Sequence, residues 1–436
     1  MPEMFHYKNG QLFCENVPVL KLAERLGTPL YVYSQSHFVH QVEAIQKAFA
    51  EVSPIVCYSV KANACLGLLR AMARIGCGFD AVSKGEIYRA LRAGADPKTI
   101  VFAGVGKRDD EIDYALEKGI LMFNVESESE LSAISRVASR RGSNVEAPIA
   151  LRLNPDVDPR THKHISTGKR ESKFGIDIER AKAALKRIRE LKNLRLKGLH
   201  LHIGSQITEN DRHAEAIAKI LPFVGEVKRS DFPLEYINVG GGYGISYRGN
   251  EGLDITAFAE KMLPHIKETG LRMVCEPGRY VCGNGGVLLT KVIFDKPSGD
   301  KNFLIVDAGM NDLIRPAIYD AYHRIWPVVS EFPVDGEITG DAGQTYDVVG
   351  PICESTDVFA KQRRLPKCSE GETLAIFSAG AYGMAMASTY NQHPRPAEVI
   401  VHGDKFWVAR ERETIEDLTR GERLTPKEVF SAEDLK

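Results

Sequence analysis

The feature that most constrains the fold of this chain is a strand–helix alternation that runs from about residue 54 to residue 276. Short runs rich in β-branched and apolar residues predict eight strands, and segments with a helical repeat separate them. The predicted strands are 54–60, 78–83, 100–104, 121–125, 147–154, 196–204, 235–241 and 272–277. Nearly continuous apolar strands between helices are typical of a parallel sheet that is buried on both faces. Because a TIM-type barrel typically spans roughly 250 residues, this pattern predicts a closed (β/α)8 barrel, with a doubly wound open sheet as the alternative.

After residue 280 the pattern changes to strands joined by turns, with almost no helical repeat. Five runs predict that this part is all-β: GGVLLTKVIFDK, NFLIVDAG, TYDVVGPIC, ETLAIFSAG and EVIVHGDKFWVA. FHYKNGQLF near the N-terminus predicts a hairpin at Asn9-Gly10. At 436 residues the chain also exceeds what one hydrophobic core usually holds. We therefore predict an α/β chain of two domains: a barrel over residues 36–280, and an all-β barrel or sandwich domain from residues 1–35 plus 281–436. We expect the charged tail from Arg410 to be a solvated helix or extension.

The composition excludes several classes of partner. The formal net charge of -1 gives no global field that would favour nucleic acid or an anionic membrane. No apolar run approaches the ~20 residues that span a bilayer, and MPEMFHYKNGQLF does not resemble a signal peptide. The eight cysteines are scattered without a CxxC pair, which indicates reduced thiols. We expect a cytoplasmic protein with no nucleic-acid or membrane partner.

Polar residues and glycines gather where the predicted barrel strands end. Taken alone each is ordinary, since most lysines are solvated surface groups and a triple glycine is usually a plain turn. Their joint placement is informative because the loops after barrel strands converge on one mouth, where barrel enzymes carry their active sites. In chain order these residues are Lys61, Asp80, Glu86, Arg152, His200, His202, Ser205, Gly240, Gly241, Gly242, Glu276, Gly278 and Arg279.

Two of these loops have the position of a phosphate site. GGGYG (240–244) follows the seventh predicted strand and EPGR (276–279) follows the eighth. Barrels commonly bind phosphate in these two loops, where free backbone N–H groups point at the anion. A lysine, a phosphate site and a carboxylate in one mouth fit pyridoxal 5'-phosphate. Lys61 would hold its aldehyde as a Schiff base, and Glu276 would keep the pyridine nitrogen protonated.

The pair His200-x-His202 has a rival interpretation as a metal site, because alternate strand positions face the same way. No cluster of carboxylates in the sequence supplies the missing ligands, and the following Gly204 and Ser205 suit a phosphate contact better. We therefore expect no metal. The imidazole of His202 is expected to stack on the pyridine ring, with His200 as a packed strand residue.

Ten ordered motifs resemble the alanine-racemase-like, fold-type III pyridoxal-phosphate enzymes, and within that group the diaminopimelate decarboxylases. The resemblance runs through nearly the whole chain. The small departures are Ser59, where the family often has alanine, and Thr356, where glycine is common. The motifs are YSVKAN (58–63), FDAVSKGE (79–86), RLNPDVDPRTH (152–162), STGKRESKFGI (166–176), GLHLHIGSQI (198–207), INVGGGYG (237–244), CEPGRYV (275–281), NDLIRPAIYDAYH (311–323), GPICESTD (350–357) and SAGAYGMAMASTYN (378–391).

The resemblance implies a role for individual residues. It implies that Lys61 carries the cofactor and that Cys353 donates the proton. Residues expected to bind the cofactor are Lys61, Asp80, His202, Ser205, Gly241, Gly242, Glu276, Gly278, Arg279 and Tyr382. Residues expected to bind the substrate are Arg279, Arg315, Tyr319, Glu354 and Tyr382.

The same resemblance implies a carboxy-lyase that converts meso-2,6-diaminopimelate to L-lysine and CO2, the last step of lysine biosynthesis. Arg315 would bind the distal carboxylate of the substrate bidentately, and Glu354 its distal ammonium. The resemblance also implies a homodimer with shared active sites, in which Cys353 and Glu354 enter the barrel mouth of the neighbouring subunit.

Three alternatives are weighed against this reading. The first is a decarboxylase for another basic amino acid or a carboxylated polyamine. Arg315 and Tyr319, which would bind a distal carboxylate, argue against simple diamino acids as substrates. An amino-acid racemase would carry arginine rather than Glu276 at the pyridine nitrogen. A non-catalytic cofactor-binding protein would keep Lys61, but it would not need Cys353 and a full β domain.

Overall fold

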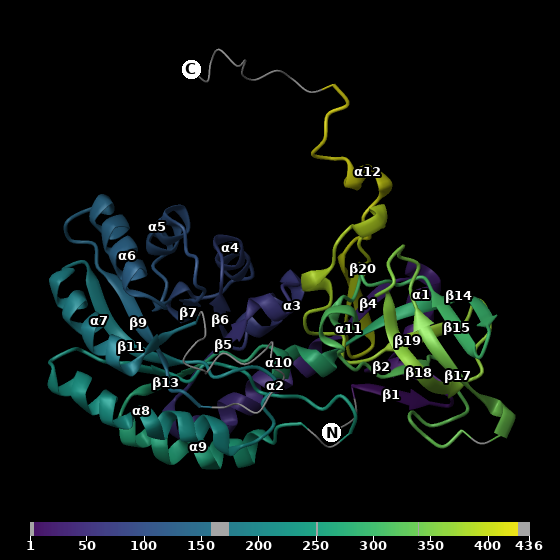
Figure 1. Cartoon of the computed structure of the whole chain (residues 1–436), viewed down its shortest axis with the longest axis horizontal. Helices are drawn as coiled ribbons and strands as arrows, with labels where there is room; N and C mark the ends of the chain where they lie inside the picture. The colour runs from purple at the N-terminus through teal and green to yellow at the C-terminus, as the bar shows by residue number, and fades with distance from the viewer. Residues whose placement is uncertain (1–3, 158–173, 250–251, 339, 426–436) are drawn as a thin grey trace.

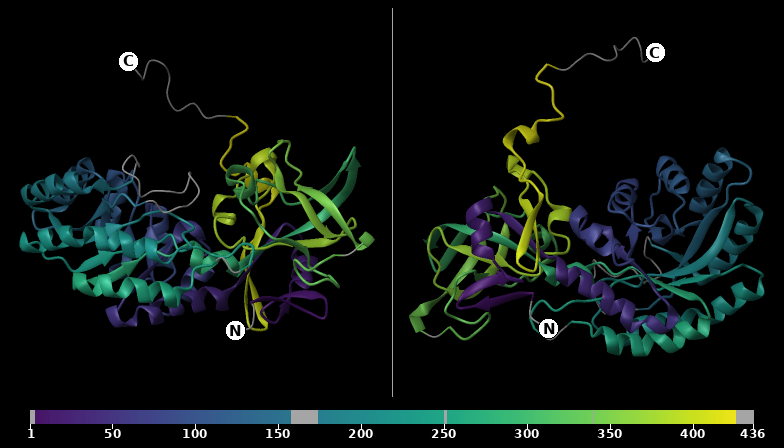
Figure 2. Two further views of the ribbon diagram at one scale, coloured as in Figure 1. Left: turned by 60° about the horizontal axis from the view of Figure 1, so that its bottom comes forward. Right: turned by 180° about the vertical axis from the view of Figure 1, so that it is seen from behind.

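The structure is a computed structural model that describes residues 4–157, 174–249, 252–338 and 340–425. Figure 1 and both views of Figure 2 show two lobes side by side, one rimmed with helices and one built of β-sheet. The motifs around Arg152 and Phe174 fall partly on residues 158–173, outside the described residues.

The first lobe is a closed barrel of eight parallel strands. Closure is given by two pairings, because β8 pairs with β9 and β13 pairs back to β5. The predicted barrel is therefore confirmed, and the open doubly wound sheet is wrong. A two-residue strand, β10 (Ile176–Asp177), adds to β9 outside this ring. The barrel strands are β5 (Ile55–Ser59), β6 (Gly78–Ala81), β7 (Ile100–Phe102), β8 (Met122–Val125), β9 (Ala147–Asn154), β11 (Leu194–Leu201), β12 (Tyr236–Asn238) and β13 (Arg272–Cys275).

Helices cover the outside of the barrel, and most of them begin at a side-chain cap. Ser34, Ser83, Ser127, Asp177 and Asp254 each accept a hydrogen bond from a backbone N–H in the first turn of the helix that follows. These caps fix where each helix starts after its strand or loop. The helices are α2 (Gln35–Ala48), α3 (Leu66–Ala73), α4 (Lys84–Arg92), α5 (Asp109–Lys118), α6 (Glu128–Arg141), α7 (Ile178–Glu190), α8 (Asp211–Arg229), α9 (Ile255–Thr269) and the short α10 (Arg279–Cys282).

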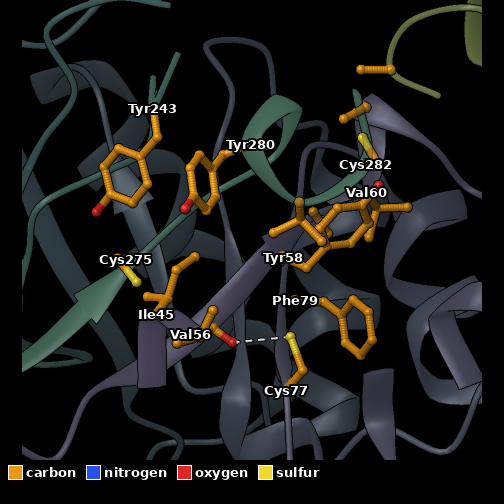
Figure 3. Close-up of a cluster of buried hydrophobic side chains, with 14 of the residues drawn as sticks. Ile45, Val56, Tyr58, Val60, Cys77, Phe79, Tyr243, Cys275, Tyr280 and Cys282 are labelled. Atoms are coloured by element: carbon orange, nitrogen blue, oxygen red, sulfur yellow. Dashed lines mark hydrogen bonds between the residues drawn. The ribbon is translucent and has the colours of Figure 1, made fainter. Parts of the chain in front are cut away.

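Strand side chains alternate between the inside of the barrel and the layer under the helices. Val56 and Tyr58 of β5 belong to the large cluster between strands and helices, where Tyr58 meets Phe79 edge-on at 6.4 Å between ring centroids (Figure 3). Cys57, between them, belongs with Val274 to a separate small cluster inside the barrel. This two-residue period decides which strand residues can face the barrel axis.

The second lobe is built of antiparallel and mixed sheet. Its strand order is β18-β17-β15-β14-β4-β20-β21, with β19 pairing both β14 and β16. The predicted all-β character of this part is confirmed, and the helices between its described strands are short, among them α11 (Arg315–Tyr319). The runs named from the sequence did not include β16 and β18. The strands are β4 (Leu30–Ser34), β14 (Gly286–Ser298), β15 (Lys301–Val306), β16 (Ile325–Pro327), β17 (Gly343–Val349), β18 (Val358–Pro366), β19 (Thr373–Ile376), β20 (Ala397–His402) and β21 (Lys405–Arg410).

The N-terminal segment joins the β lobe. β4 pairs with β14 and β20, and a separate three-stranded sheet contains β1 (Phe5–Lys8), β2 (Gln11–Cys14) and β3 (Val17–Pro18) ahead of α1 (Val19–Leu26). The hairpin predicted at Asn9-Gly10 joins β1 to β2 and is confirmed. The charged tail contains the short helix α12 (Ile415–Leu418), and its last eleven residues, 426–436, lie outside the described residues. Among the described helices, none is both long and apolar enough to cross a bilayer.

Candidate active site

The two-residue period carries polar side chains onto the barrel axis at the C-terminal ends of the strands. Cys57 and Val274 face inward, so Ser59 and Glu276, two residues further along, lie on the same side. Asn124 stands in the same relation to Met122 on β8. The closed barrel therefore gathers these side chains at one mouth, as its fold class requires.

Lys61 lies just beyond β5 and points at Asp80 on the neighbouring strand. Its Nζ donates to Asp80 Oδ2 at 2.5 Å, and Ser59 Oγ donates to the same oxygen at 2.7 Å. The carboxylate of Asp80 is fully buried, whereas the side chain of Lys61 is 39% exposed and opens to the mouth. Burial alone would lower the pKa of Lys61, but the charge of Asp80 more than offsets this and raises it above its ordinary value.

Glu276 lies at the centre of the site and is held by three side chains from other strands. Asn124 Nδ2 and Asn238 Nδ2 each donate to Glu276 Oε1 at 2.6 Å, and His200 Nε2 lies 3.2 Å from Oε2. Burial would raise the pKa of Glu276, whereas His200 and Lys61 lower it. The resulting pKa is below the ordinary value, so Glu276 is an ionised carboxylate inside the barrel.

The glycine loop after β12 packs directly against the backbone of Glu276. A Cβ on Gly241 would stand 2.0 Å from the carbonyl oxygen of Glu276, and one on Gly242 would stand 2.1 Å from that of Gly204. Only glycine permits this approach. The N–H of Gly241 donates to His202 Nδ1 at 3.2 Å, which fixes the imidazole, and burial holds the pKa of His202 well below its ordinary value.

Two buried arginines share one tyrosine at the border of the lobes. Arg279 donates to Tyr247 Oη at 2.6 Å, and the guanidinium of Arg315 lies 5.3 Å from the centre of the Tyr247 ring. Arg315 also donates to His323 Nε2 at 2.7 Å. No carboxylate of the described residues lies within ion-pair distance of either guanidinium. Because buried charges are normally compensated, the pair is suited to anionic ligand groups.

The β lobe closes over the lysine through the loop around Tyr382. The backbone N–H of Tyr382 donates to the carbonyl of Ala62 at 2.8 Å, and Asn63 Nδ2 donates to the carbonyl of Gly380 at 3.0 Å. The ring of Tyr382 lies 4.9 Å under the guanidinium of Arg279. Tyr382 holds a φ of 56°, a costly conformation for a non-glycine residue that the surrounding contacts maintain.

Of the remaining predicted residues, three lie on the β lobe and two lie at the mouth. Cys353 and Glu354 are exposed on the loop after β17, and the backbone N–H of Cys353 donates to Asn391 Oδ1. Tyr319 is 37% exposed at the end of α11. Ser205 and Gly278 lie at the mouth, where a Cβ on Gly278 would stand 3.1 Å from that of Ser59.

These residues fit pyridoxal phosphate. The glycine loop brings backbone close to the mouth, and Arg279 is a buried cation without an anionic partner among the described residues. Lys61 is accessible for an aldehyde, and Glu276 offers a buried negative charge for a pyridinium nitrogen. A barrel with this mouth defines the class of enzymes that bind pyridoxal phosphate in a TIM-type fold.

Comparison with known proteins agrees with that class. The family model described as pyridoxal-dependent decarboxylase, pyridoxal binding domain, matches residues 35–283. The diaminopimelate decarboxylase of Pseudomonas aeruginosa is 44% identical over 98% of this chain and 100% of its own length. That of Neisseria meningitidis is 46% identical over 93% of this chain and 97% of its own length. The chain therefore belongs to the pyridoxal-dependent decarboxylases and, within them, to the diaminopimelate decarboxylase family.

Solved structures give the same result. The Helicobacter pylori diaminopimelate decarboxylase complexed with L-lysine has a TM-score of 0.86 and 38% identity, covering 92% of this chain and 98% of that one. The M. jannaschii enzyme in co-complex with L-lysine has a TM-score of 0.89 and 36% identity, covering 97% and 98%. The resemblance inferred from the ten motifs is confirmed, and pyridoxal phosphate is the cofactor of this family.

Sequence reasoning missed four residues of the site. Asn124 and Asn238 are polar residues inside two otherwise apolar predicted strands, LMFNV and EYINVGG, so their position was a usable signal. Tyr247 lies three residues beyond GGGYG, and His323 ends the RPAIYDAYH run. His200, interpreted as a packed strand residue, is fully buried and also faces Glu276.

The close approach of Gly241 to Glu276 makes a stability prediction. We expect Gly241→Ala to lower the free energy of unfolding by about 1–3 kcal/mol, because the new methyl group overpacks a rigid loop. Gly106→Ala is the matched control, since a Cβ there meets no atom within 4 Å, and it should change stability by less than about 0.5 kcal/mol. Denaturant unfolding of both variants measures the difference. Equal stability of the two would contradict the tight contact.

Proposed function

We propose that this chain removes CO2 from meso-2,6-diaminopimelate and releases L-lysine. The observation that carries the proposal is the pair of buried arginines, Arg279 and Arg315, without a carboxylate partner in the described residues, beside Lys61 and Glu276. One cation suits the phosphate of the cofactor, and the second suits a carboxylate of the substrate. Curated diaminopimelate decarboxylases that align over nearly the whole chain support the same activity.

The cofactor supplies, when bound, a pyridinium ring that stabilises the electron pair left at Cα when CO2 departs. Glu276 would face the ring nitrogen and keep it protonated, because its own pKa is low and its charge is buried. His202 would cover one face of the ring. The phosphate would be held by Ser205, Gly241, Gly242, Gly278 and Arg279, and Tyr382 would reach the cofactor from the β lobe.

Lys61 would hold the aldehyde of the cofactor covalently, and for this its ammonium must first lose a proton. Its Nζ lies 2.5 Å from Asp80 Oδ2, which makes this carboxylate the nearest acceptor. Burial raises the pKa of Asp80, while Lys61 lowers it. Asp80 therefore stabilises the ammonium of Lys61 in the resting protein and can take its proton when the lysine reacts.

Arg315 binds the distal carboxylate of the substrate. Its guanidinium is fixed by His323, which accepts through Nε2 and donates through Nδ1 to the carbonyl of Phe377 at 2.8 Å. Burial lowers the pKa of His323 to about 3, so this histidine stays neutral and can accept from the arginine. Glu354 binds the distal ammonium, and Tyr319 lines the same end of the substrate.

The proposal includes a homodimer with composite sites. Cys353 is the one exposed thiol of the eight cysteines, and Glu354 beside it is also exposed. Cys353 and Glu354 lie on the surface of their own chain. They would therefore complete an active site by entering the barrel mouth of a second copy of the chain. The eight free thiols support a cytoplasmic location.

The activity itself is tested directly. Incubation with meso-diaminopimelate should yield CO2 and L-lysine in equal amounts, and Lys61→Ala should abolish both, whereas the exposed Lys98→Ala should not. Borohydride reduction followed by peptide mapping should label Lys61, because the reduced link to the cofactor is stable. A label on another lysine would overturn the assignment, and absence of lysine among the products would overturn the activity.

Specificity is tested at the distal clamp. Arg315→Leu should lower kcat/KM by about ten- to a hundredfold, since a charge-assisted hydrogen bond contributes roughly 1.5–3 kcal/mol, with little change in cofactor affinity. Arg315→Lys keeps the charge without the planar guanidinium, so its kcat/KM should lie between those of the wild type and the leucine variant. A wild-type kcat/KM in the leucine variant would show that Arg315 does not bind the distal carboxylate. It would favour the alternative function, a decarboxylase for another basic amino acid.

The shared site is tested by mixing two inactive chains. Lys61→Ala and Cys353→Ala should each be nearly inactive, because every site then lacks one group. Unfolding and refolding an equal mixture should make half of the dimers mixed, each with one intact site. Activity should return to about a quarter of wild type, the statistical value for an isologous dimer. A mixture that stays inactive despite chain exchange would place both groups in one chain.

A further inference from the structure

We propose that Asn124 and Asn238 are positioning residues that hold Glu276 in the orientation and charge state in which it meets the ring nitrogen of the cofactor. This inference rests on the proposed function, because it gives a purpose to the contact between Glu276 and the ring. It assigns a role to two residues to which the sequence analysis gave none.

The two amides act on the same oxygen of the carboxylate. Asn124 Nδ2 and Asn238 Nδ2 both donate to Glu276 Oε1 at 2.6 Å, and the two asparagines are fully buried. Hydrogen bonds from donors to an ionised acceptor are the short, strong kind, and they favour the charged form of the acceptor. Because Oε1 is occupied twice, the carboxylate cannot rotate about its last bond without losing two hydrogen bonds.

The donors approach from different sides of the barrel. Asn238 is the last residue of β12, the neighbour of β13. Asn124 is the last but one residue of β8, which is separated from β13 by three strands in either direction around the ring. Asn124 therefore reaches Glu276 across the barrel axis. Donors on adjacent and opposite strands keep the carboxylate centred in the mouth.

The amide of Asn238 and the backbone of Asn124 are each fixed by a further hydrogen bond. Asn238 Oδ1 accepts from the N–H of Gly240 at 3.0 Å, so its nitrogen has to face Glu276. The N–H of Glu276 donates in turn to the carbonyl of Gly240 at 2.7 Å. On the other side, the buried Lys107 donates from Nζ to the backbone carbonyl of Asn124 at 2.8 Å and to Glu130 at 2.6 Å. The glycine loop and an internal ion pair thus anchor the two donors.

If Asn124 and Asn238 served only to fill space, they would not need an amide group that donates a hydrogen bond. Aspartate has the shape of asparagine and keeps the oxygen that accepts from Gly240, but it cannot donate while ionised. Its charge beside Glu276 would also force the two carboxyl groups to share a proton. Asparagine-to-aspartate exchange therefore preserves shape and removes the proposed function of the residue.

The test compares two cofactors that differ in one ring atom. The protein is stripped of cofactor and titrated with pyridoxal phosphate and with 1-deazapyridoxal phosphate, in which a C–H replaces the ring nitrogen. We expect the wild-type protein to bind pyridoxal phosphate about ten- to a hundredfold more tightly than the analogue. In Asn124→Asp and Asn238→Asp this preference should fall by about tenfold, because the analogue cannot use Glu276 and is therefore less affected.

The matched control is Asn193→Asp, at the opposite end of the barrel. Asn193 also donates through its amide, to the carbonyl of Val145 at 2.9 Å, so the exchange costs one hydrogen bond there as well. The control should keep the wild-type preference. If an aspartate variant does not fold, Asn124→Leu removes the donor without adding charge, and it should lose the preference in the same way.

The outcomes separate the inference from the proposed function. Loss of the preference in the variants, with the control unchanged, supports the inference. An undiminished preference, or equal weakening of both ligands, would overturn it and leave the decarboxylase intact. A wild-type protein without any preference would overturn both the inference and the contact of Glu276 with the ring nitrogen. The production of lysine from diaminopimelate decides the activity separately.

Discussion

The site is organised around one negative charge, Glu276, on the axis of a closed barrel. A buried carboxylate is costly unless donors surround it. Here Asn124 and Asn238 donate to Glu276 from two strands, and His200 lies beside it on a third. That arrangement exists only because the sheet closes and brings the ends of its strands to one mouth. The same closure places the glycine loop within contact of the Glu276 backbone.

The β lobe adds side chains to the site at the mouth of the barrel. It supplies Arg315 and His323, and its loop around Tyr382 binds the backbone beside Lys61. Tyr247 of the barrel contacts Arg279 and Arg315 at once, so the two cations are held in a fixed relation. In the proposed function, the spacing between the phosphate of the cofactor and the substrate carboxylate would therefore be set where the two lobes meet.

Local pattern was sufficient for much of the fold. The eight barrel strands follow from apolar runs between helical segments, and each observed strand overlaps its predicted range. Lys61, Asp80 and Glu276 could be named because each lies within two residues of the C-terminal end of a strand, where barrels collect their chemistry. β16 and β18 were missed in a region where short strands lack the regular alternation with helices. The domain boundaries remain a prediction.

By itself, the sequence determined the barrel, the all-β second lobe, the family and the residues that carry its motifs, because periodicity and motifs are local properties of the chain. Only the tertiary structure decided that Asn124 and Asn238 meet on one oxygen of Glu276, and that Tyr247 and His323 hold the two arginines. Asn124 and Glu276 are 152 residues apart in sequence, and their contact crosses the barrel axis. The physical reason is that hydrogen bonds to a buried charge depend on how the sheet closes in space, which no local spacing encodes.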